Sequence, residues 1–439
     1  MKRPFFINDM EGKFFRKGTA RTKFIIRNYK RIILFFLFFC TLSYTHAQTH
    51  DLHYYLQQGE SNSPLLKDYQ NQIKTGILDS QLVRAANRPQ VLANGQVMIV
   101  PNINGYEYDP AITNGGNYAA VLSVSQPIFN RKILEPQYRR VELQDQSISN
   151  TAHISRLDLE KSITSQYINT YAGYQQLLSN REVYDLLVAQ QDILKKLVQN
   201  GIYKQTDYLS FQVSLQSQEI ALSQLQMQYR SDIATLNYLC GIRDTSFTLL
   251  QTPDISGGDF VTKSNSVFFR GFTIDSLKII NNKALIDARY KPAINWFADA
   301  GMQSSQPNTI YHHFGTDFGL NLSIPIYDGK QRKIEYRQLK IAEDTRNNYA
   351  SFFDHQYDQQ RAMLFQQLTE SGNLVRQIEE KLSTAQMLID MDKKLLNTGN
   401  VPITDYIIAI NNYLTIKDNL NQADINRLHI INQLNYWNH

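Results

Sequence analysis

Two aspartates occupy matching places in the sequence and are the residues best suited to electrostatic work. Asp207 follows Gly201 by six residues, and Asp405 follows Gly399 by six, so the two motifs lie 198 residues apart. Carboxylates that gather at one place attract cations. A carboxylate in the first turn of a helix also stabilises that helix, by about 0.3 to 1 kcal/mol. The sequence alone leaves an electrostatic role and a helix-capping role open for Asp207 and Asp405.

The other reactive residues form no catalytic or metal-binding pattern. His312 and His313 are adjacent in an expected loop but have no third ligand, which is typical of solvated residues. Cys240 is the only cysteine outside residues 1–47, which excludes a disulfide framework. There is no Gly-rich phosphate loop, nucleophile–base pair or His-Glu helix motif. The sequence therefore predicts no enzyme, no metal site and no cofactor.

Residues 1–47 have the composition of a cleaved signal peptide. Ten Lys and Arg lie within residues 1–31 against Asp9 and Glu11, an apolar run at 32–42 follows, and Thr45-His46-Ala47 resembles a cleavage site. The apolar run is too short to span a bilayer, and a short membrane anchor is the alternative. Residues 1–31 have a net charge of +8, whereas the whole chain has +5, so the remainder has a net charge of −3. The basic total is therefore no evidence for nucleic-acid binding.

The 198-residue offset extends far beyond the two aspartates. Residues 236–238 (Leu-Asn-Tyr) return as 434–436, and the segment 125–130 returns in altered form as 323–328. We interpret residues 48–240 and 272–439 as two repeats, joined by a Gly-, Pro- and Ser-rich linker at 241–271. Each repeat is expected to contain a short helix (64–87; 274–289), a β-hairpin (90–126; 293–324) and a long helical hairpin (131–240; 329–437).

The strand patterns alternate between apolar and polar residues. In the last expected strand, 316–324, the apolar side is formed by Phe318, Leu320, Leu322 and Ile324. Proline has no amide hydrogen for a strand ladder, so Pro127 and Pro325 are expected to mark strand–helix junctions, followed by Asn130 and Asp328 as helix caps. Such strands match a transmembrane barrel, and a soluble hairpin with one buried face is the alternative. Four strands cannot close alone, so a barrel would pool strands from several chains.

Two segments, 133–199 and 331–396, contain no convincing helix breaker, apart from Pro136 in the first turn of the first segment and a tolerable Gly173. A helix of that length would be about 100 Å long at 1.5 Å per residue. This is too long for a compact core and favours an extended coiled-coil-like assembly, with return helices at 207–239 and 404–436.

Together these features resemble the TolC-like outer-membrane efflux protein family. The resemblance rests on the tandem units, the Pro-Ile-Phe and Pro-Ile-Tyr junctions at 127–129 and 325–327, and the spacing from Gly to Asp in each tip turn. It implies a mainly α protein with transmembrane β-strands, in which four strands per chain join a trimeric 12-stranded outer-membrane barrel above an α-helical periplasmic tunnel. It also implies a homotrimer in outer-membrane lipid that docks onto a periplasmic adaptor (membrane fusion protein) and an inner-membrane pump.

The resemblance assigns roles to individual residues as well. Asp207 and Asp405 would gate the periplasmic mouth, where clustering in a trimer would raise some of their pKa values. The exposed tip turns would contact the adaptor, although a plain helical hairpin would also place glycine there; these tip residues are Gly201, Ile202, Tyr203, Gly399, Asn400 and Val401. The family often has a second acidic residue three positions after each Asp, where this chain has Ser210 and Ile408.

The sequence therefore predicts a passive exit duct of the outer membrane, coupled to an adaptor and a pump. Drugs, metal ions and proteins remain open as substrates. The alternative is an exported periplasmic coiled-coil scaffold that binds partners without conducting anything.

Overall fold

The computed structural model describes residues 49–439, apart from residues 102, 107–108, 110–111, 113–114, 129–130, 245–247 and 258–261. The expected signal peptide (1–47) and the expected helix cap Asn130 lie outside the described residues. Residues Asp51–His439 form one compact unit, which contains the long helices and the large sheet. The short strand β1 (Thr49–His50) precedes that unit in the sequence.

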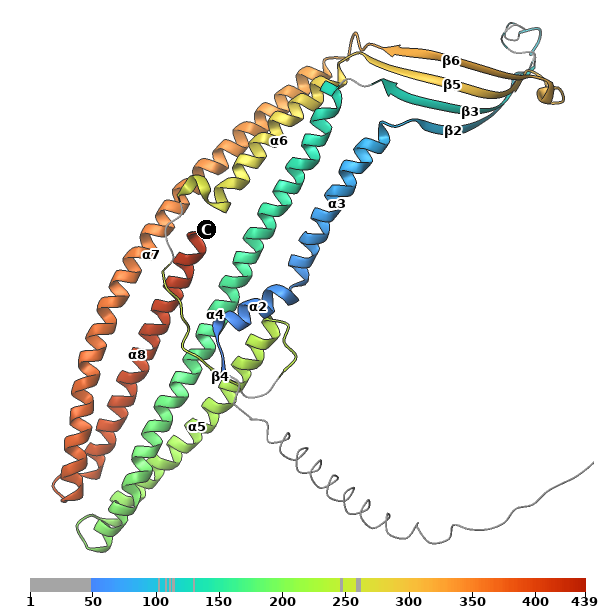
Figure 1. The fold of residues 1–439 in the computed structure, drawn as a ribbon. Helices are drawn as coiled ribbons and strands as arrows, with labels where there is room; N and C mark the ends of the chain where they lie inside the picture. Colours follow the sequence, from blue (N-terminus) through green and yellow to red (C-terminus); the bar gives the residue numbers. More distant parts are fainter. Residues whose placement is uncertain are drawn as a thin grey trace, which may run out of the picture. The chain divides into compact units, whose positions relative to one another are not determined.

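Besides the short 3-10 helix η2 (Ile310–His312), seven α-helices and one further 3-10 helix, η1, occur in the described part of this unit. They are α2 (Leu52–Asn62), α3 (Pro64–Ala86), α4 (Arg131–Gln199), α5 (Gln205–Leu239), η1 (Lys263–Asn265), α6 (Val267–Arg289), α7 (Gln331–Asn397) and α8 (Ile403–Trp437). With 69 and 67 residues, α4 and α7 confirm the two very long helices. Each packs against its own return helix, α5 or α8, and α8 also packs against α4 (Figure 1). None of the described helices combines the length and apolarity needed to cross a bilayer.

Two helical segments differ from the expectation. Helix α2 is not among the expected elements, and α6 begins at Val267, so residues 267–271 of the expected linker are helical. Ser266 explains the early start, because its hydroxyl accepts a hydrogen bond from the Phe268 amide at the helix N-terminus. Ser63 caps α3 in the same way through the Leu66 amide.

The described strands of the large sheet are β2 (Gln90–Ile99), β3 (Gly116–Ile128), β5 (Ala293–Ser304) and β6 (Phe314–Ser323). They are antiparallel in the order β2-β3-β5-β6, so β2 and β6 are the edges (Figure 1). A further two-residue strand, β4 (Leu249–Leu250), follows α5. The strand expected at 90–99 is confirmed residue for residue.

Two strand ends correct the expectation. Pro127 was expected to end its strand but lies within β3, opposite Asn295 of β5. Proline is tolerated there because the β2 partner has already ended, with Gln90 opposite Ser125, so no ladder hydrogen bond is lost on that side. Ile324 was expected within a strand but follows β6, which ends at Ser323; Pro325 then lies between β6 and α7 as expected.

Asp328 supplies capping hydrogen bonds to α7 as the sequence predicted, although Lys330 occupies the cap position itself. Its carboxylate accepts hydrogen bonds from the amides of Lys330 and Arg332, both at 2.8 Å. Lys330 itself has a left-handed backbone conformation, and the helix begins at the next residue. The Arg332 amide, followed by the Tyr290 hydroxyl, holds the pKa of Asp328 below its usual range.

A hydrophobic cluster where α2 crosses α4 and α5 anchors the middle of the unit. It contains Tyr55, Tyr167, Tyr229 and the buried Cys240. The hydroxyls of Tyr167 and Tyr229 donate to the carbonyls of Gln251 and Thr248, both at 2.7 Å, and thereby fasten the segment after α5 to the helices. Burial raises the pKa of the Cys240 thiol to about 12, so this thiol is an inert core residue.

Substituting two of the helical glycines, Gly59 and Gly372, should change stability in opposite directions. Gly59 of α2 is buried against Ile163, and a β-carbon there would overlap the Ile163 side chain. Gly59→Ala should therefore cost about 1 to 3 kcal/mol through overpacking. Gly372→Ala in α7 meets open space and should stabilise the protein by up to about 1 kcal/mol through helix propensity. Denaturant unfolding followed by circular dichroism measures both, and a stabilised Gly59→Ala would contradict the packing described.

Candidate functional site: the tip turns and the two-faced sheet

The two turns that join the long helices share one backbone geometry. Gly201 and Gly399 have φ values of 75° and 77°, in the left-handed region that favours glycine. In the first turn the amides of Gly201 and Ile202 donate to the carbonyls of Val198 and Leu197. The second turn repeats both bonds, from Gly399 to Leu396 and from Asn400 to Leu395. This is the Schellman arrangement that ends a helix, and it explains why both copies require glycine.

The two turns also contact each other. The Tyr203 hydroxyl lies 2.7 Å from the carbonyl of Val401 and 3.1 Å from that of Leu396. A β-carbon on Gly399 would lie 2.5 Å from Cγ2 of Ile202, so the second turn passes directly over that side chain. Burial, followed by the nearby Asp207 carboxylate, raises the pKa of Tyr203. Of the six tip residues, Tyr203, Gly399 and Val401 are half-buried, and Gly201, Ile202 and Asn400 are exposed, although the Ile202 side chain also contacts the second turn.

Behind the turns, all four long and return helices share one hydrophobic cluster. Its largest members are Tyr208 and Phe211 from α5 and Tyr406 and Tyr413 from α8, and its aliphatic members include Leu194 of α4 and Ile389 of α7. Burial, with the carboxylates of Asp390 and Asp392 adding to it, raises the pKa of Tyr406 to about 12. The two hairpins thus form one packed tip.

Polar contacts that the sequence analysis missed join the hairpins beside this cluster. Glu182 of α4 accepts a hydrogen bond from the Tyr413 hydroxyl at 3.0 Å and forms an ion pair with Lys417 of α8. Gln190 of α4 donates to Asn397 at 2.6 Å. The partners lie far apart in the sequence, and helical periodicity places each on its own helix without indicating which helices meet.

The two candidate gate residues lie in unequal environments. Asp207 is half-buried, and its carboxylate accepts a hydrogen bond from the Lys204 amide at 3.2 Å. Asp405 is exposed in the first turn of α8. Neither Thr206 nor Thr404 is a helix cap, because the helices already begin at Gln205 and Ile403, with Lys204 and Pro402 at the cap positions. Asp207 itself closes the first turn of its helix, and its gating role stays a prediction.

At the other end of the unit, the register gives the sheet one continuous apolar face. Leu320 of β6 lies opposite Trp296 of β5, which lies opposite Gln126 of β3, whose amide oxygen accepts the indole N–H at 3.3 Å. The remaining side chains on this face are apolar or small, and they include Phe318, Leu322, Ala298, Val124, Leu122, Val91 and Val97. Phe318 is 89% exposed and Leu320 70% exposed, so this face lacks a cover within the chain.

The opposite face of the sheet is largely polar. Asp299 of β5 lies directly opposite Asp317 of β6 and is flanked on its other side by Ser123 of β3. Two carboxylates at opposed positions are destabilising in a dry environment and are tolerated in water. The two faces therefore suit two different solvents.

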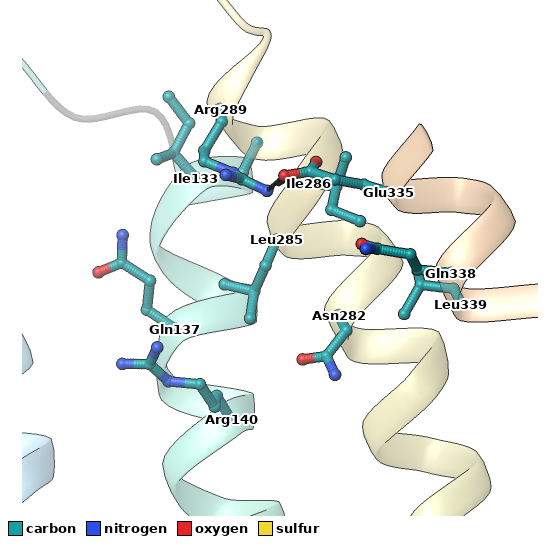
Figure 2. Close-up of a pocket in the computed structure, with 11 residues that line it drawn as sticks. Ile133, Gln137, Arg140, Asn282, Leu285, Ile286, Arg289, Glu335, Gln338 and Leu339 are labelled. Atoms are coloured by element: carbon teal, nitrogen blue, oxygen red, sulfur yellow. Dashed lines mark hydrogen bonds and ion pairs between the residues drawn. The ribbon is translucent and has the colours of Figure 1, made fainter. Parts of the chain in front are cut away.

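A hollow of about 700 Å³ lies between α4, α6 and α7 near their sheet ends. Its ionisable lining groups are Arg140 and the pair Arg289–Glu335, in which one guanidinium nitrogen lies 2.8 Å from each carboxylate oxygen (Figure 2). It contains no nucleophile beside a base. Among the described residues, no group of three or more His, Cys, Asp or Glu is arranged to hold a metal ion.

Comparison with known proteins identifies the fold. No family model matches the sequence, and no curated protein matches it. Solved structures do match, at 11 to 14% identity over 88% of this chain. They include the outer membrane protein VceC from Vibrio cholerae (12% identity, TM-score 0.68, 96% of that chain) and the Campylobacter jejuni CmeC outer membrane channel (14%, 0.62, 85%). The Neisseria gonorrhoeae MtrE outer membrane channel also matches (11%, 0.65, 88%).

The chain has the fold of an outer-membrane channel. The fold expected from the TolC-like resemblance is therefore confirmed as a mainly helical protein with a few strands. The roles of the tip and strand residues stay predictions.

The contact between Ile202 and Gly399 should separate the effects of substituting the two tip glycines. Gly201→Ala meets open space and should cost only the left-handed strain, about 1 to 2 kcal/mol. Gly399→Ala adds an overlap with Ile202 and should cost more. Ile202→Ala should recover that additional cost in the double variant but not in the Gly201→Ala background. A double-mutant cycle from denaturant unfolding measures the coupling, and equal costs for the two glycines would show that Gly399 does not pack against Ile202.

Proposed function

We propose that three copies of this chain form a passive exit duct across the outer membrane. The two-faced sheet carries this proposal. An apolar face of four strands suits lipid, and the opposed Asp299 and Asp317 suit a wet lumen. The edges β2 and β6 cannot remain unpaired in hydrocarbon, and three four-stranded sheets would close a 12-stranded barrel. The channel fold of the solved structures supports the same arrangement.

In this assembly the helical part of each chain extends into the periplasm as a tunnel wall, and the tip turns form its far mouth. We propose that the exposed tip residues Gly201, Ile202 and Asn400 dock onto a periplasmic adaptor, which connects the duct to an inner-membrane pump. The half-buried residues Tyr203, Gly399 and Val401 would hold the two turns in register for that contact. The pump would supply the energy, and the duct contributes an open path.

Asp207 and Asp405 would place six carboxylates at the mouth of the trimer. Such a ring would favour cations over anions at the entrance. Asp405, being exposed, is free to face the pore, whereas Asp207 also closes the first turn of α5. Both carboxylates are part of the proposed gate.

Planar-bilayer recordings of the purified full chain test this gate. Asp207→Asn keeps an oxygen that can accept the Lys204 amide but removes the charge, whereas Asp207→Ala removes both. If the carboxylates gate the pore, cation selectivity should fall in the Asp207→Asn/Asp405→Asn variant as much as in the alanine variant. Glu219→Gln, an exposed site on α5, is the matched control and should leave selectivity unchanged.

Two outcomes would contradict the proposal at different levels. Unchanged selectivity in both double variants, with lower stability only in Asp207→Ala, would make the aspartates structural. Absence of any conductance, together with recovery of the protein in the soluble periplasmic fraction, would favour the exported scaffold over the duct.

A further inference from the structure

The elements of the two halves of the chain are related by two constant offsets. Pro64 and Gln90 begin α3 and β2, and Val267 and Ala293 begin α6 and β5, 203 residues later in both cases. From the second strand of each hairpin onward the offset is 198, as between the starts of β3 and β6 or the ends of α4 and α7. The shorter second hairpin loop accounts for the difference. Each residue of these elements in one half therefore has a defined equivalent position in the other half.

Within the chain, α4 packs against α6 through three positions at seven-residue spacing. Asn150 donates to the carbonyl of Val267 at 3.1 Å, and Asn281 donates to the carbonyl of Pro136 at 2.9 Å. Midway between these bonds, Leu143 and Ile274 occupy the same helix faces and are 1% and 3% exposed. All six residues are buried; they are Pro136, Leu143, Asn150, Val267, Ile274 and Asn281.

The equivalent six positions on α7 and α3 are all exposed. Adding 198 to the α4 positions gives Ile334, Ile341 and Asn348; subtracting 203 from the α6 positions gives Pro64, Asn71 and Leu78. Ile341, the counterpart of the fully buried Leu143, is 66% exposed, and Leu78 and Ile334 are 56% and 52% exposed. A stripe of this kind at positions that are core in the other half indicates a missing partner helix.

We propose that α7 of one copy packs against α3 of the next, and β6 against β2, in the register that α4–α6 and β3–β5 have within the chain. The occupant of each exposed stripe is thus a second copy of this chain. The proposal deepens the proposed function, on which it rests, by specifying residue by residue how the copies meet.

The strand edges are compatible with the same register. Within the chain, Leu122 of β3 lies opposite Ala300 of β5, and Ile128 lies opposite Ile294. The offsets convert these pairs into Leu320 opposite Val97 and Ile326 opposite Val91. Both new pairs join the apolar faces of β6 and β2, whereas a slip by one residue would place polar side chains on that face. Ile326, which is 95% exposed, would then be covered, and β6 would extend by three residues to match β3.

Two polar contacts fit the same register. The Lys291 ammonium donates to the carbonyl of Lys132 at 3.3 Å, and the equivalent residues, Arg88 and Lys330, are again a donor-bearing side chain and a carbonyl. Asn348 retains the side chain of Asn150 and could donate to the carbonyl of Pro64 in the next copy. By contrast, the buried bond between Asn281 and Pro136 is replaced by the apolar pair Leu78 and Ile334. The interface between copies therefore combines apolar contacts with at least two hydrogen bonds.

Disulfide cross-linking of the full chain in detergent tests this register. The two adjacent pairs Val97→Cys/Leu320→Cys and Gln96→Cys/Asn321→Cys are used together, because neighbouring opposed pairs alternate between wide and close spacing and one of them suits a disulfide. Asn71→Cys/Ile341→Cys probes the helices independently. Oxidation should give a covalent trimer on denaturing, non-reducing electrophoresis that reductant returns to monomer. Cys240 is 1% exposed and can stay in place.

The controls separate a wrong register from a wrong assembly. Leu320→Cys combined with Gly95→Cys or Ile99→Cys represents a slip of two residues and should remain monomeric, as should each single variant. Cross-linking of a slipped pair in place of the matched pairs would overturn the register and leave the trimer standing, as would a trimer by native mass without any cross-link. A monomer by native mass without any cross-link would overturn both the register and the proposed function.

Discussion

The constraint on which this structure depends is the hydrogen-bonding demand of a sheet that is apolar on one side and open at both edges. The amides and carbonyls along the outer sides of β2 and β6 have no strand beside them in the described part of the chain. In water they would be solvated, but the apolar face formed by residues such as Phe318 and Leu320 favours a solvent without hydrogen bonds. Only further strands satisfy both conditions, so the sheet is a fragment of a larger closed structure in the proposed assembly.

The helices follow from the same requirement. In the chain, α3 and α6 precede β2 and β5, and α4 and α7 follow β3 and β6, so the pairing of the sheet edges also sets the distance between the outer faces of α3 and α7 (Figure 1). This explains why heptad positions that are buried on α4 and α6 reappear as exposed Ile334, Ile341 and Leu78. The length of α4 and α7 also places the tip turns far from the sheet. In the proposed assembly, closing the sheet and building a tunnel are thus one structural solution.

The sequence predicted the parts of this fold that local periodicity controls. Alternation located β2 to the residue, and the absence of breakers located α4 and α7. It missed α2 and the first turns of α6, because where such helices begin depends on caps such as Ser266 rather than on a periodic apolar pattern. It also ended β3 too early, because the tolerance of Pro127 depends on β2 having already ended, which is a property of pairing. At the tip it found the glycines and aspartates, but contacts such as Glu182 with Lys417 require knowing which helices meet.

The tip turns are duplicates that the tertiary structure makes unequal. The β-carbon position of Gly201 faces open space, whereas that of Gly399 faces Ile202; Asp207 accepts a backbone hydrogen bond, whereas Asp405 is exposed. The inequality arises because Tyr203 reaches from the first turn to the carbonyls of the second. A movement that opens one turn must therefore break contacts with the other. In the proposed duct, the first turn serves as the support and the second presents its carboxylate, so the mouth opens by moving paired hairpins rather than single loops.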